Sequence, residues 1–296
     1  MKFLPTTWFR GFISIGLVLG TIGAAQATTY SVFTSDGRIN MGNDSLFTVL
    51  TVGGSNYLSN SLSNSASITG NVGIAGKGNY TTSSGTITGD LYMNSFGNLS
   101  ITGTGKVTGK KHGARTSQGE DGTDETTTLA NALADANSLA SAAAALAHTS
   151  NYSVTQGSFT QGQSINITSS SNAITINGAT NNPFNQPVVL SINSFTMSSG
   201  NLTLTGNSHT TFVLNITGNF TMNSSANILL TGGVLASHVL FNLEGTTSNT
   251  FTVAMGDSAS GVFLAPNRNV SMDGKIYGRL ITNQLCMSCG GQVVSQ

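Results

Sequence analysis

Charged residues are scarce in this chain of 296 residues, and their scarcity restricts the partners it can have. Lysine and arginine together number 11, as do aspartate and glutamate, so charged residues make up 7% of the sequence. Soluble domains typically carry about 25%. Without a basic excess, the chain lacks the attraction that nucleic acids and anionic membranes require. We therefore expect no nucleic-acid partner, and a surface built from serine, threonine, asparagine and glycine.

Long apolar runs are also missing after the first residues. Lys2 precedes an apolar run, Phe12–Ala25, and Ala25-Gln26-Ala27 supplies a small-x-small cleavage pattern. The run is shorter than the roughly 20 residues of a membrane span, and the pattern is typical of a secretory signal peptide. We expect removal of residues 1–27, no membrane span, and a secreted, extracellular protein of residues 28–296 that is free or associated with a cell surface.

Cysteine is limited to Cys286 and Cys289, a C-x-x-C pair near the end of the chain. A redox motif would need a βαβ context, and a zinc site would need a second pair of ligands; neither accompanies this pair. In an exported protein we predict instead a small structural disulfide between the two. No other pattern indicates a metal site or a cofactor.

A short segment recurs along the chain. Its copies begin at Leu91, Phe195, Phe220 and Val270, each with a methionine two residues later, and the second and third are about 25 residues apart. Such a period is typical of a solenoid, in which each coil lays its strands on the preceding coil.

Within the copies the residues alternate as they do in strands. In Leu202-Thr203-Leu204-Thr205 the leucines face one way and the threonines the other. Glycine and asparagine punctuate the strand ends, and only four prolines are available to interrupt the ladders. The sequence therefore predicts short strands, tight corners and a narrow apolar core.

The segment from Asp124 to His148 breaks this pattern. It is rich in alanine and leucine, and its apolar residues follow the i, i+3, i+4, i+7 spacing of one helical face. Thr123 or Asp124 is placed to cap its start. We predict one amphipathic helix whose small residues dock against a flat sheet, since a coiled-coil seam would need larger residues. The preceding stretch, 110–122, is polar and is expected to be an exposed loop.

Coils, one long helix and further coils resemble the ice-binding-like fold, which includes bacterial and fungal ice-binding proteins and the adhesive domains of the choice-of-anchor A group. Phe47–Leu50 and Ile68–Ile74 are similar to the family's opening strand and its I-x-G-(N/D)-(V/L)-G coil. Gly261–Asn267 and Gly274–Ile281 are similar to its closing coils. The resemblance spans most of residues 45–285.

This resemblance implies a mainly β fold, a right-handed β-solenoid of roughly triangular section with the helix packed along one side, in a single domain. It leaves the function open, because the fold hosts both ice binders and adhesins. Members of the adhesive group usually carry a C-terminal anchor, and Gly290–Gln296 contains neither a sorting signal nor an apolar tail. That departure favours a freely secreted protein or one held by a partner.

Outward threonines are the candidate binding residues. Thr86 with Thr88, Thr102 with Thr104, and Thr203 with Thr205 are expected to face outward in i, i+2 pairs. Thr217 and Thr221 extend the set. Stacked about 4.8 Å apart, such pairs would form a flat array of methyl groups and hydroxyls that orders water in an ice-like lattice. The alternative is that threonine, a good strand former, merely fills solvated strand faces.

A catalytic site has little support. His112, His148, His209 and His238 are dispersed and fit no nucleophile or metal motif. The glycine neighbours of Asp257 and Asp273 indicate turn aspartates rather than a carboxylate pair.

We therefore expect a non-enzymatic protein that binds an extended surface: a cell surface, a matrix glycan or ice. Adhesion is the first expectation, ice binding the alternative, and a polysaccharide-active enzyme the least favoured.

Overall fold

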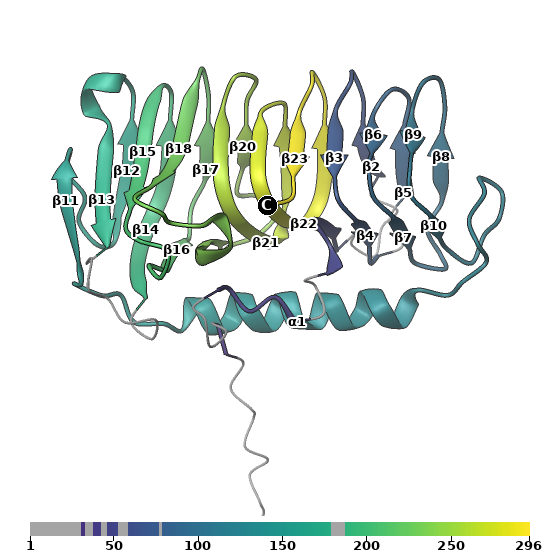
Figure 1. The fold of residues 1–296 in the computed structure, drawn as a ribbon, viewed down its shortest axis with the longest axis horizontal. Helices are drawn as coiled ribbons and strands as arrows, with labels where there is room; N and C mark the ends of the chain where they lie inside the picture. Colours follow the sequence, from purple (N-terminus) through teal and green to yellow (C-terminus); the bar gives the residue numbers. More distant parts are fainter. Residues whose placement is uncertain (1–30, 33–37, 43–45, 53–58, 77–78, 179–186) are drawn as a thin grey trace, which may run out of the picture.

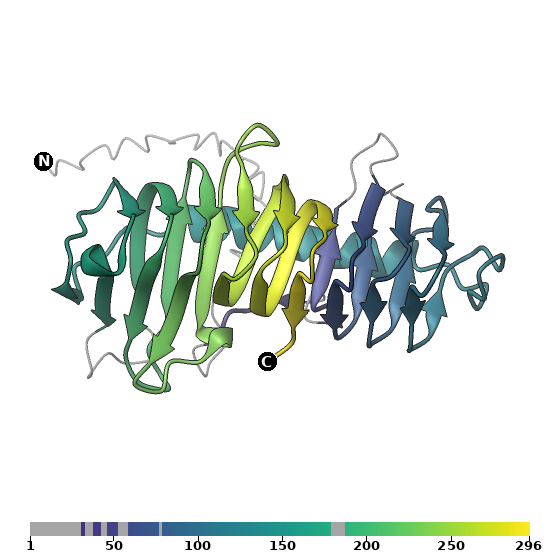
Figure 2. The ribbon, with the colours of Figure 1, turned by 90° about the horizontal axis from the view of Figure 1, so that it is seen from above.

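The computed structural model describes residues 31–32, 38–42, 46–52, 59–76, 79–178 and 187–296. Over these residues the chain winds into a β-solenoid with three strand-bearing faces and a long helix alongside (Figures 1 and 2). This confirms the predicted mainly β solenoid fold. In the described part of the chain every strand pair is parallel except β11 with β13.

We name the faces a, b and c. Face a contains β10 (Lys111–His112), β7 (Leu91–Met93), β4 (Val72–Ile74), β1 (Val49–Thr51), β19 (Val239–Leu243) and β16 (Phe212–Ile216). Face b contains β8 (Leu99–Ile101), β5 (Asn79–Thr82), β2 (Ser59–Leu62), β20 (Phe251–Val253), β17 (Phe220–Met222) and β12 (Gln163–Ile167). Face c contains β9 (Lys106–Val107), β6 (Thr86–Ile87), β3 (Ser67–Thr69), β23 (Gln292–Val294), β18 (Ala226–Thr231), β15 (Gly200–Thr205), β13 (Ile174–Gly178) and β11 (Tyr152–Gln156).

Three longer strands bend from one face to the next. β14 (Val188–Met197) continues from face a into face b, and β21 (Ser258–Met272) and β22 (Lys275–Met287) pass through faces c, a and b in turn. Two short 3-10 turns, η2 (Ser170–Asn172) and η3 (Ala236–His238), lie between strands.

The coils are stacked in a different order from the chain. β1 pairs with β22 as well as with β4, β2 pairs with β22 and β5, and β23 pairs with β3. The last coil therefore lies against the first, in the middle of the solenoid (Figure 1). The helix carries the chain from the end formed by β8, β9 and β10 to the end formed by β11 and β13.

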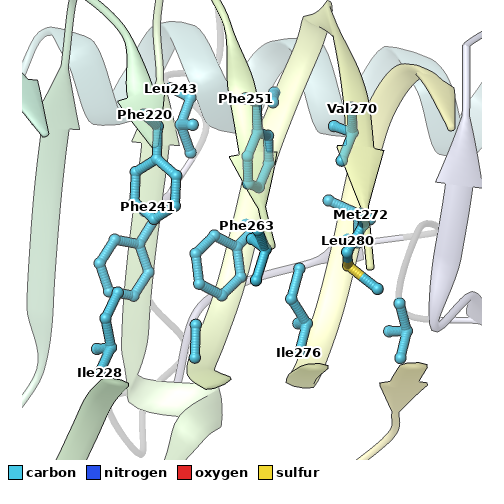
Figure 3. Packing of buried hydrophobic residues seen from close by; sticks show 14 of the residues in the cluster. Phe220, Ile228, Phe241, Leu243, Phe251, Phe263, Val270, Met272, Ile276 and Leu280 are labelled. Atoms are coloured by element: carbon cyan, nitrogen blue, oxygen red, sulfur yellow. The ribbon is translucent and has the colours of Figure 1, made fainter. Parts of the chain in front are cut away.

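Inward side chains fill the solenoid with a continuous apolar core (Figure 3). Behind face b, Phe195, Phe220 and Phe251 are in register on successive coils, and the rings of Phe195 and Phe220 stack with centroids 4.6 Å apart. Behind face c the corresponding side chains are aliphatic, as at Ile228 and Ile276. Burying each such side chain contributes about 1.5–3 kcal/mol to the stability of the fold. The core therefore stabilises the solenoid although its surface has few charged groups.

Helix α1 (Thr126–Ala144) covers face a, and it is shorter than the predicted segment. Its buried residues form one stripe of leucine and alanine: Leu129, Ala132, Ala136, Leu139 and Ala143. The Asp124 carboxylate accepts hydrogen bonds from the backbone N–H of Thr126 (3.0 Å) and from its hydroxyl (2.6 Å). The Thr123 hydroxyl donates to Asp121 instead.

Two buried asparagines bind the end of the helix to the sheet. Asn215 Nδ2 donates to the carbonyl oxygen of Ala143 at 2.8 Å, and Asn242 Nδ2 donates to that of Ala140 at 3.2 Å. Asn242 also donates to Asn215 Oδ1 at 2.9 Å, so the two amides form a ladder between coils. Buried amides need such partners, and these satisfy helix carbonyls near its C-terminus.

A glycine is required where β22 crosses the corner between faces c and a. Gly278 has a φ of 140° and pairs with Gly261 on β21. A Cβ on Gly278 would lie 2.0 Å from the Gly261 carbonyl oxygen. Only glycine permits this close approach. Across the described residues, no helix has the length and apolarity needed to cross a membrane.

Candidate functional site

Faces b and c are the open faces of the solenoid. Face a is covered by α1 and by Ile39 and Met41, which precede β1 in the sequence. Ile39 and Met41 belong to a second apolar cluster that also contains Leu240 and Ile281. A surface for binding an extended partner must therefore be sought on the other two faces.

A row of small uncharged side chains runs along face b. It occupies the outward position between two buried residues in most strands. Strand pairing aligns the members from coil to coil: Asn166, Thr196, Thr221, Thr252, Ser271, Cys286, Ser61, Thr81 and Ser100. We call this the face b row. Its members are spaced by the interstrand distance of about 4.8 Å.

Large buried side chains beneath the row hold it level. Phe220 and Met222 flank Thr221 and are both fully buried. The same arrangement of a large residue on each side recurs around Thr196, Thr252 and Ser271. These buried, close-packed side chains restrict the motion of the strands that carry the row.

The surroundings of the row are nearly free of charge. On its border with face a lie Ser194, Asn219, Thr250, Asn269, Gln284, Asn79 and Asn98. Several of these side-chain amides form hydrogen bonds between neighbouring coils. Asn219 Oδ1, for example, accepts a hydrogen bond from the backbone N–H of Thr250 at 3.1 Å. On the border with face c, Asp273 accepts a 2.5 Å hydrogen bond from the Ser288 hydroxyl.

Several hydroxyls of the row are available to an external partner. Thr221 Oγ1 lies 3.4 Å from Thr250 Oγ1, and Ser61 Oγ donates to Cys286 Sγ at 3.3 Å. In the part of the chain that the structure describes, the hydroxyls of Thr196, Thr252 and Ser271 have no protein partner. They can hydrogen-bond to water or to a ligand.

A loop borders the row on the side of face a. Residues 244–250 connect β19 to β20. A shallow hollow of about 320 Å³ is lined by Thr247, Asn249 and Thr250 of this loop together with Thr252, Ser271 and Cys286. The buried Arg268 holds the base of this loop. Its guanidinium donates to the carbonyl oxygens of Gly218 (2.7 Å), Ile216 (2.9 Å) and Glu244.

Burial lowers the pKa of Arg268 to about 10, an effect that the Glu244 carboxylate partly offsets. Burial also raises the pKa of Glu244, again against the influence of Arg268. Arg268 therefore stays protonated at neutral pH and keeps its donors for the three carbonyls.

Face c presents a mixed outward row. Thr175, Thr203 and Leu229 follow one another on β13, β15 and β18, and Ser260, Tyr277 and Val294 follow on β21, β22 and β23. Lys106 and Lys275 add charge beside this row. Face c thus lacks the uniformity of face b.

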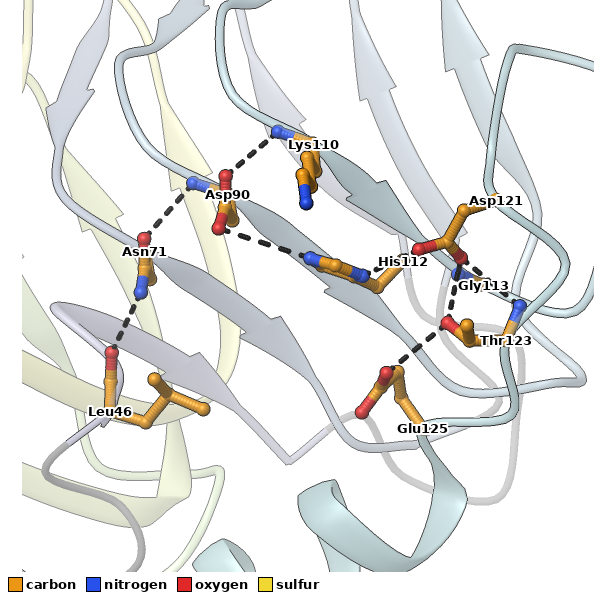
Figure 4. Close-up of polar contacts among 9 residues, drawn as sticks. All are labelled: Leu46, Asn71, Asp90, Lys110, His112, Gly113, Asp121, Thr123 and Glu125. Carbon is orange, nitrogen blue, oxygen red and sulfur yellow. Dashed lines mark hydrogen bonds and ion pairs between the residues drawn. The ribbon is translucent and has the colours of Figure 1, made fainter.

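A cluster of polar side chains lies at the end of the solenoid formed by β10 (Figure 4). The His112 ring stacks on Tyr92 with centroids 4.5 Å apart, and its Nδ1 lies 2.7 Å from Asp121 Oδ2. Asp90 Oδ2 lies 3.8 Å from His112 Nε2. Hydrogen bonds from Thr123 hold the pKa of Asp121 well below its usual range. Over the described ranges, no group of three or more His, Cys, Asp or Glu residues is placed to hold a metal ion.

A family model for the ice-binding-like adhesive domain matches residues 17–293 of the sequence. The chain belongs to the ice-binding-like adhesive domain family. This confirms the resemblance drawn from Phe47–Leu50 and the closing coils. No curated protein matches the sequence.

Solved structures with the same fold include ice-binding proteins. One from the Antarctic ascomycete Antarctomyces psychrotrophicus is 18% identical, with a TM-score of 0.52 over 87% of this chain and 98% of that one. One from an Antarctic biological consortium is 18% identical, with a TM-score of 0.50 over 87% and 90%. LeIBP from an Arctic yeast is 20% identical, with a TM-score of 0.49 over 89% and 93%. At these identities the likeness establishes the fold. The family is described as an ice-binding-like adhesive domain, and these neighbours are described as ice-binding proteins.

The solenoid does not bring all of the predicted threonines onto one face. Thr221 belongs to the face b row, whereas Thr86, Thr203 and Thr205 lie on strands of face c. Thr88 follows the end of β6 on that face.

The remaining predicted threonines lie at corners. Thr102 and Thr104 flank the turn between β8 and β9, so they are not an i, i+2 pair on a strand, and Thr217 lies between β16 and β17. Two of the three predicted pairs therefore share face c, whereas Thr102, Thr104 and Thr217 lie at corners and Thr221 lies on face b, so the full set does not form a single array.

The two cysteines are free thiols in the structure, in place of the predicted disulfide. Cys286 lies within β22, in register with Ser61 and Ser271, and is a member of the face b row. Cys289 lies beyond the strand end, in a turn with a φ of 48°. The ladder on both sides of Cys286 fixes it on the sheet, while Cys289 belongs to the turn that leads to β23.

Asp257 and Asp273 are both held within turns. Asp257 is buried and accepts the backbone N–H groups of Ala226 (2.7 Å) and Ala254 (3.1 Å). Asp273 is held by Ser288, as described above.

Sequence reasoning missed most members of the face b row. Thr196, Thr252 and Ser271 each lie between a large apolar residue and Met or Val, and this apolar–hydroxyl–apolar triplet was the available signal. The i, i+2 threonine pairs drew attention instead to β6 and β15 on face c and to the corner after β8.

Proposed function

We propose that the domain binds ice through face b. The observation that carries this proposal is the row of aligned, uncharged side chains that passes from β12 to β8 across the whole stack. The ice-binding proteins with TM-scores of 0.50 and 0.52 support it at the level of the fold.

The chemistry of the row suits ordered water. Hydroxyls at a regular spacing exchange hydrogen bonds with water molecules, while the threonine methyl groups between them leave shallow apolar sites. Charged groups would orient their own hydration shells and disturb a regular lattice. The rigid core beneath the row means that little conformational entropy is lost when the surface meets a solid.

This function places the protein outside the cell. The N-terminal pattern supports secretion after removal of residues 1–27, and the mature protein would then be one domain of residues 28–296. The row needs no catalytic group, cofactor or metal, and we propose a non-enzymatic protein.

The test is thermal hysteresis and inhibition of ice recrystallisation by residues 28–296. We expect both, together with faceted ice crystals whose planes bind the fluorescently labelled protein. Bovine serum albumin is the negative control. If residues 28–296 have no more effect than albumin on the freezing point, the crystal shape and the growth of ice grains, ice binding is refuted.

Adhesion is a second candidate, favoured by the adhesive-domain description of the matching family. It predicts retention of the labelled protein on cells or matrix at room temperature, where no ice is present. Retention without any hysteresis would favour adhesion over ice binding, and release of reducing sugar from a polysaccharide would contradict a non-enzymatic function.

A further inference from the structure

A trough opens on face c where two strands part. β18 is joined to β21 by one residue pair among the described residues, Asn227 with Ser258. Beyond this pair, Leu229–Thr231 leaves β21, and the chain turns through residues 232–235 into η3. The separation leaves a trough of about 360 Å³ between β18, the turn and β22.

The trough is mainly apolar, with hydroxyls on one side. Its apolar lining consists of Ile228, Leu229, Leu230, Val234, Leu235, Ala236 and Tyr277. Leu229 is 38% exposed and Leu235 is 45% exposed, which is unusual on this hydroxyl-rich surface. Ser258 and Ser260 add hydroxyls and Gln296 adds an amide, and among the described residues no Lys, Arg, Asp or Glu side chain lines the trough.

Tyr277 supplies an aromatic ring beside these leucines. It lies in the outward row of β22, between Ser260 and Val294 on the neighbouring strands. Within the described residues its ring has no aromatic partner and its hydroxyl has no hydrogen-bond partner. Tyr277 therefore offers a flat apolar ring face and a hydroxyl group that can form hydrogen bonds, both beside the apolar trough.

We infer that this trough binds a neutral sugar ring of a polysaccharide. A pyranose presents a C–H face that packs on Tyr277 and Leu229, and equatorial hydroxyls that reach Ser258, Ser260 and the phenol. The trough is open along face c, so a polymer can enter and leave it. The site is separate from face b and does not rest on ice binding.

A protein partner fits the trough less well than a sugar. A stable protein interface buries about 800 Å² on each partner around an apolar centre. Here the apolar lining is bounded by the polar row of Asn201, Asn227, Ser258 and Lys275. The apolar lining is thus confined to a hollow of about 360 Å³, which suits one sugar unit better than a protein surface.

Affinity electrophoresis in native gels tests the inference directly. The mature chain is run through gels with dextran as a neutral α-glucan, laminarin as a neutral β-glucan, or alginate as an anionic polymer. We expect retardation by at least one neutral polymer and none by alginate. Tyr277→Ala should raise the Kd roughly two- to tenfold, and Tyr277→Phe should raise it less, because the ring is kept.

Leu235→Ser gives a second probe that leaves β22 intact, and it should also weaken retardation. Thr88→Ala, an exposed substitution on face c away from the trough, is the control and should behave as the parent chain. Circular dichroism melts confirm that each variant is folded. Absence of retardation by both neutral glucans, retardation by alginate alone, or retardation unaffected by Tyr277→Ala and Leu235→Ser would each overturn the inference. Ice assays on the same samples report on face b separately.

Discussion

Faces b and c are formed by the same winding of the chain, yet they present different surfaces. On face b the outward row is uninterrupted, with Thr196, Thr221 and Thr252 on successive strands. On face c, Thr203 is followed by Leu229, and Tyr277 follows Ser260. The inward residues secure the fold on both faces, which leaves the outward residues to determine what each face binds.

The two faces also differ in what supports them. Phenylalanines and methionines lie beneath the middle of face b, on β14, β17 and β20–β22, whereas mainly isoleucine, leucine and valine lie beneath face c. The aromatic pairs across coils, Phe195 stacked on Phe220 and Phe251 edge-on to Phe220, each add about 0.5–1.5 kcal/mol beyond the burial of their area. We therefore expect face b to be the more sensitive to changes in its core.

Removing an aromatic support should have the largest effect. Phe220→Ala should lower the free energy of unfolding by about 3–5 kcal/mol, because it leaves a cavity among Phe195, Phe241 and Phe251. Ile228→Ala, beneath face c, should cost about 2–5 kcal/mol. Urea denaturation measures both.

Thermal hysteresis per folded molecule separates the two variants. It should fall for Phe220→Ala and stay unchanged for Ile228→Ala. Equal hysteresis in both would show that the aromatic support does not matter to face b.

The corner beside face b should come next in effect. Arg268→Met removes the donors to the carbonyls of Ile216, Gly218 and Glu244, and we expect a loss of about 1–3 kcal/mol, since unsatisfied buried carbonyls are costly. Arg268→Lys keeps the charge but not the fork of donors, and should recover part of this loss. Chemical denaturation at pH 7 gives both values, and unchanged stability in Arg268→Met would argue against a clamp at this corner.

The smallest change in stability is expected on face c. Leu229→Thr gives its outward row a third threonine after Thr175 and Thr203, so that β13, β15 and β18 match the row of face b. Because Leu229 is partly exposed, the free energy of unfolding should change by no more than about 0.5 kcal/mol. Retardation by neutral glucan should weaken while thermal hysteresis is kept. Loss of hysteresis would mean that face c takes part in ice binding.

Sequence alone predicted the architecture because it depends on regular patterns. The methionine-bearing repeats indicated the coils, and the alanine–leucine spacing indicated α1, although the helix ends at Ala144 rather than near His148. The stretch 110–122, expected to be an exposed loop, contributes β10.

The stacking order and the site were harder to predict. Pairing of β22 with β1 joins segments more than 200 residues apart, and nothing local in Val49–Thr51 indicates its partner. The face b row depends on the equally distant pairing of β2 with β22, which places Ser61 beside Cys286. The trough arises where β18 separates from β21. The alternation of residues in Ile228–Thr231 is that of an ordinary strand and does not predict this separation.

One pair of variants tests directly whether ice binding depends on face b. Thr221 and Thr203 are both half-buried outward threonines in mid-strand, each between two in-register neighbours, but on different faces. We would measure thermal hysteresis of Thr221→Lys and Thr203→Lys at equal folded concentration. Ice binding through face b predicts near-complete loss for Thr221→Lys and parental activity for Thr203→Lys. Equal loss in both, or loss only in Thr203→Lys, would contradict it.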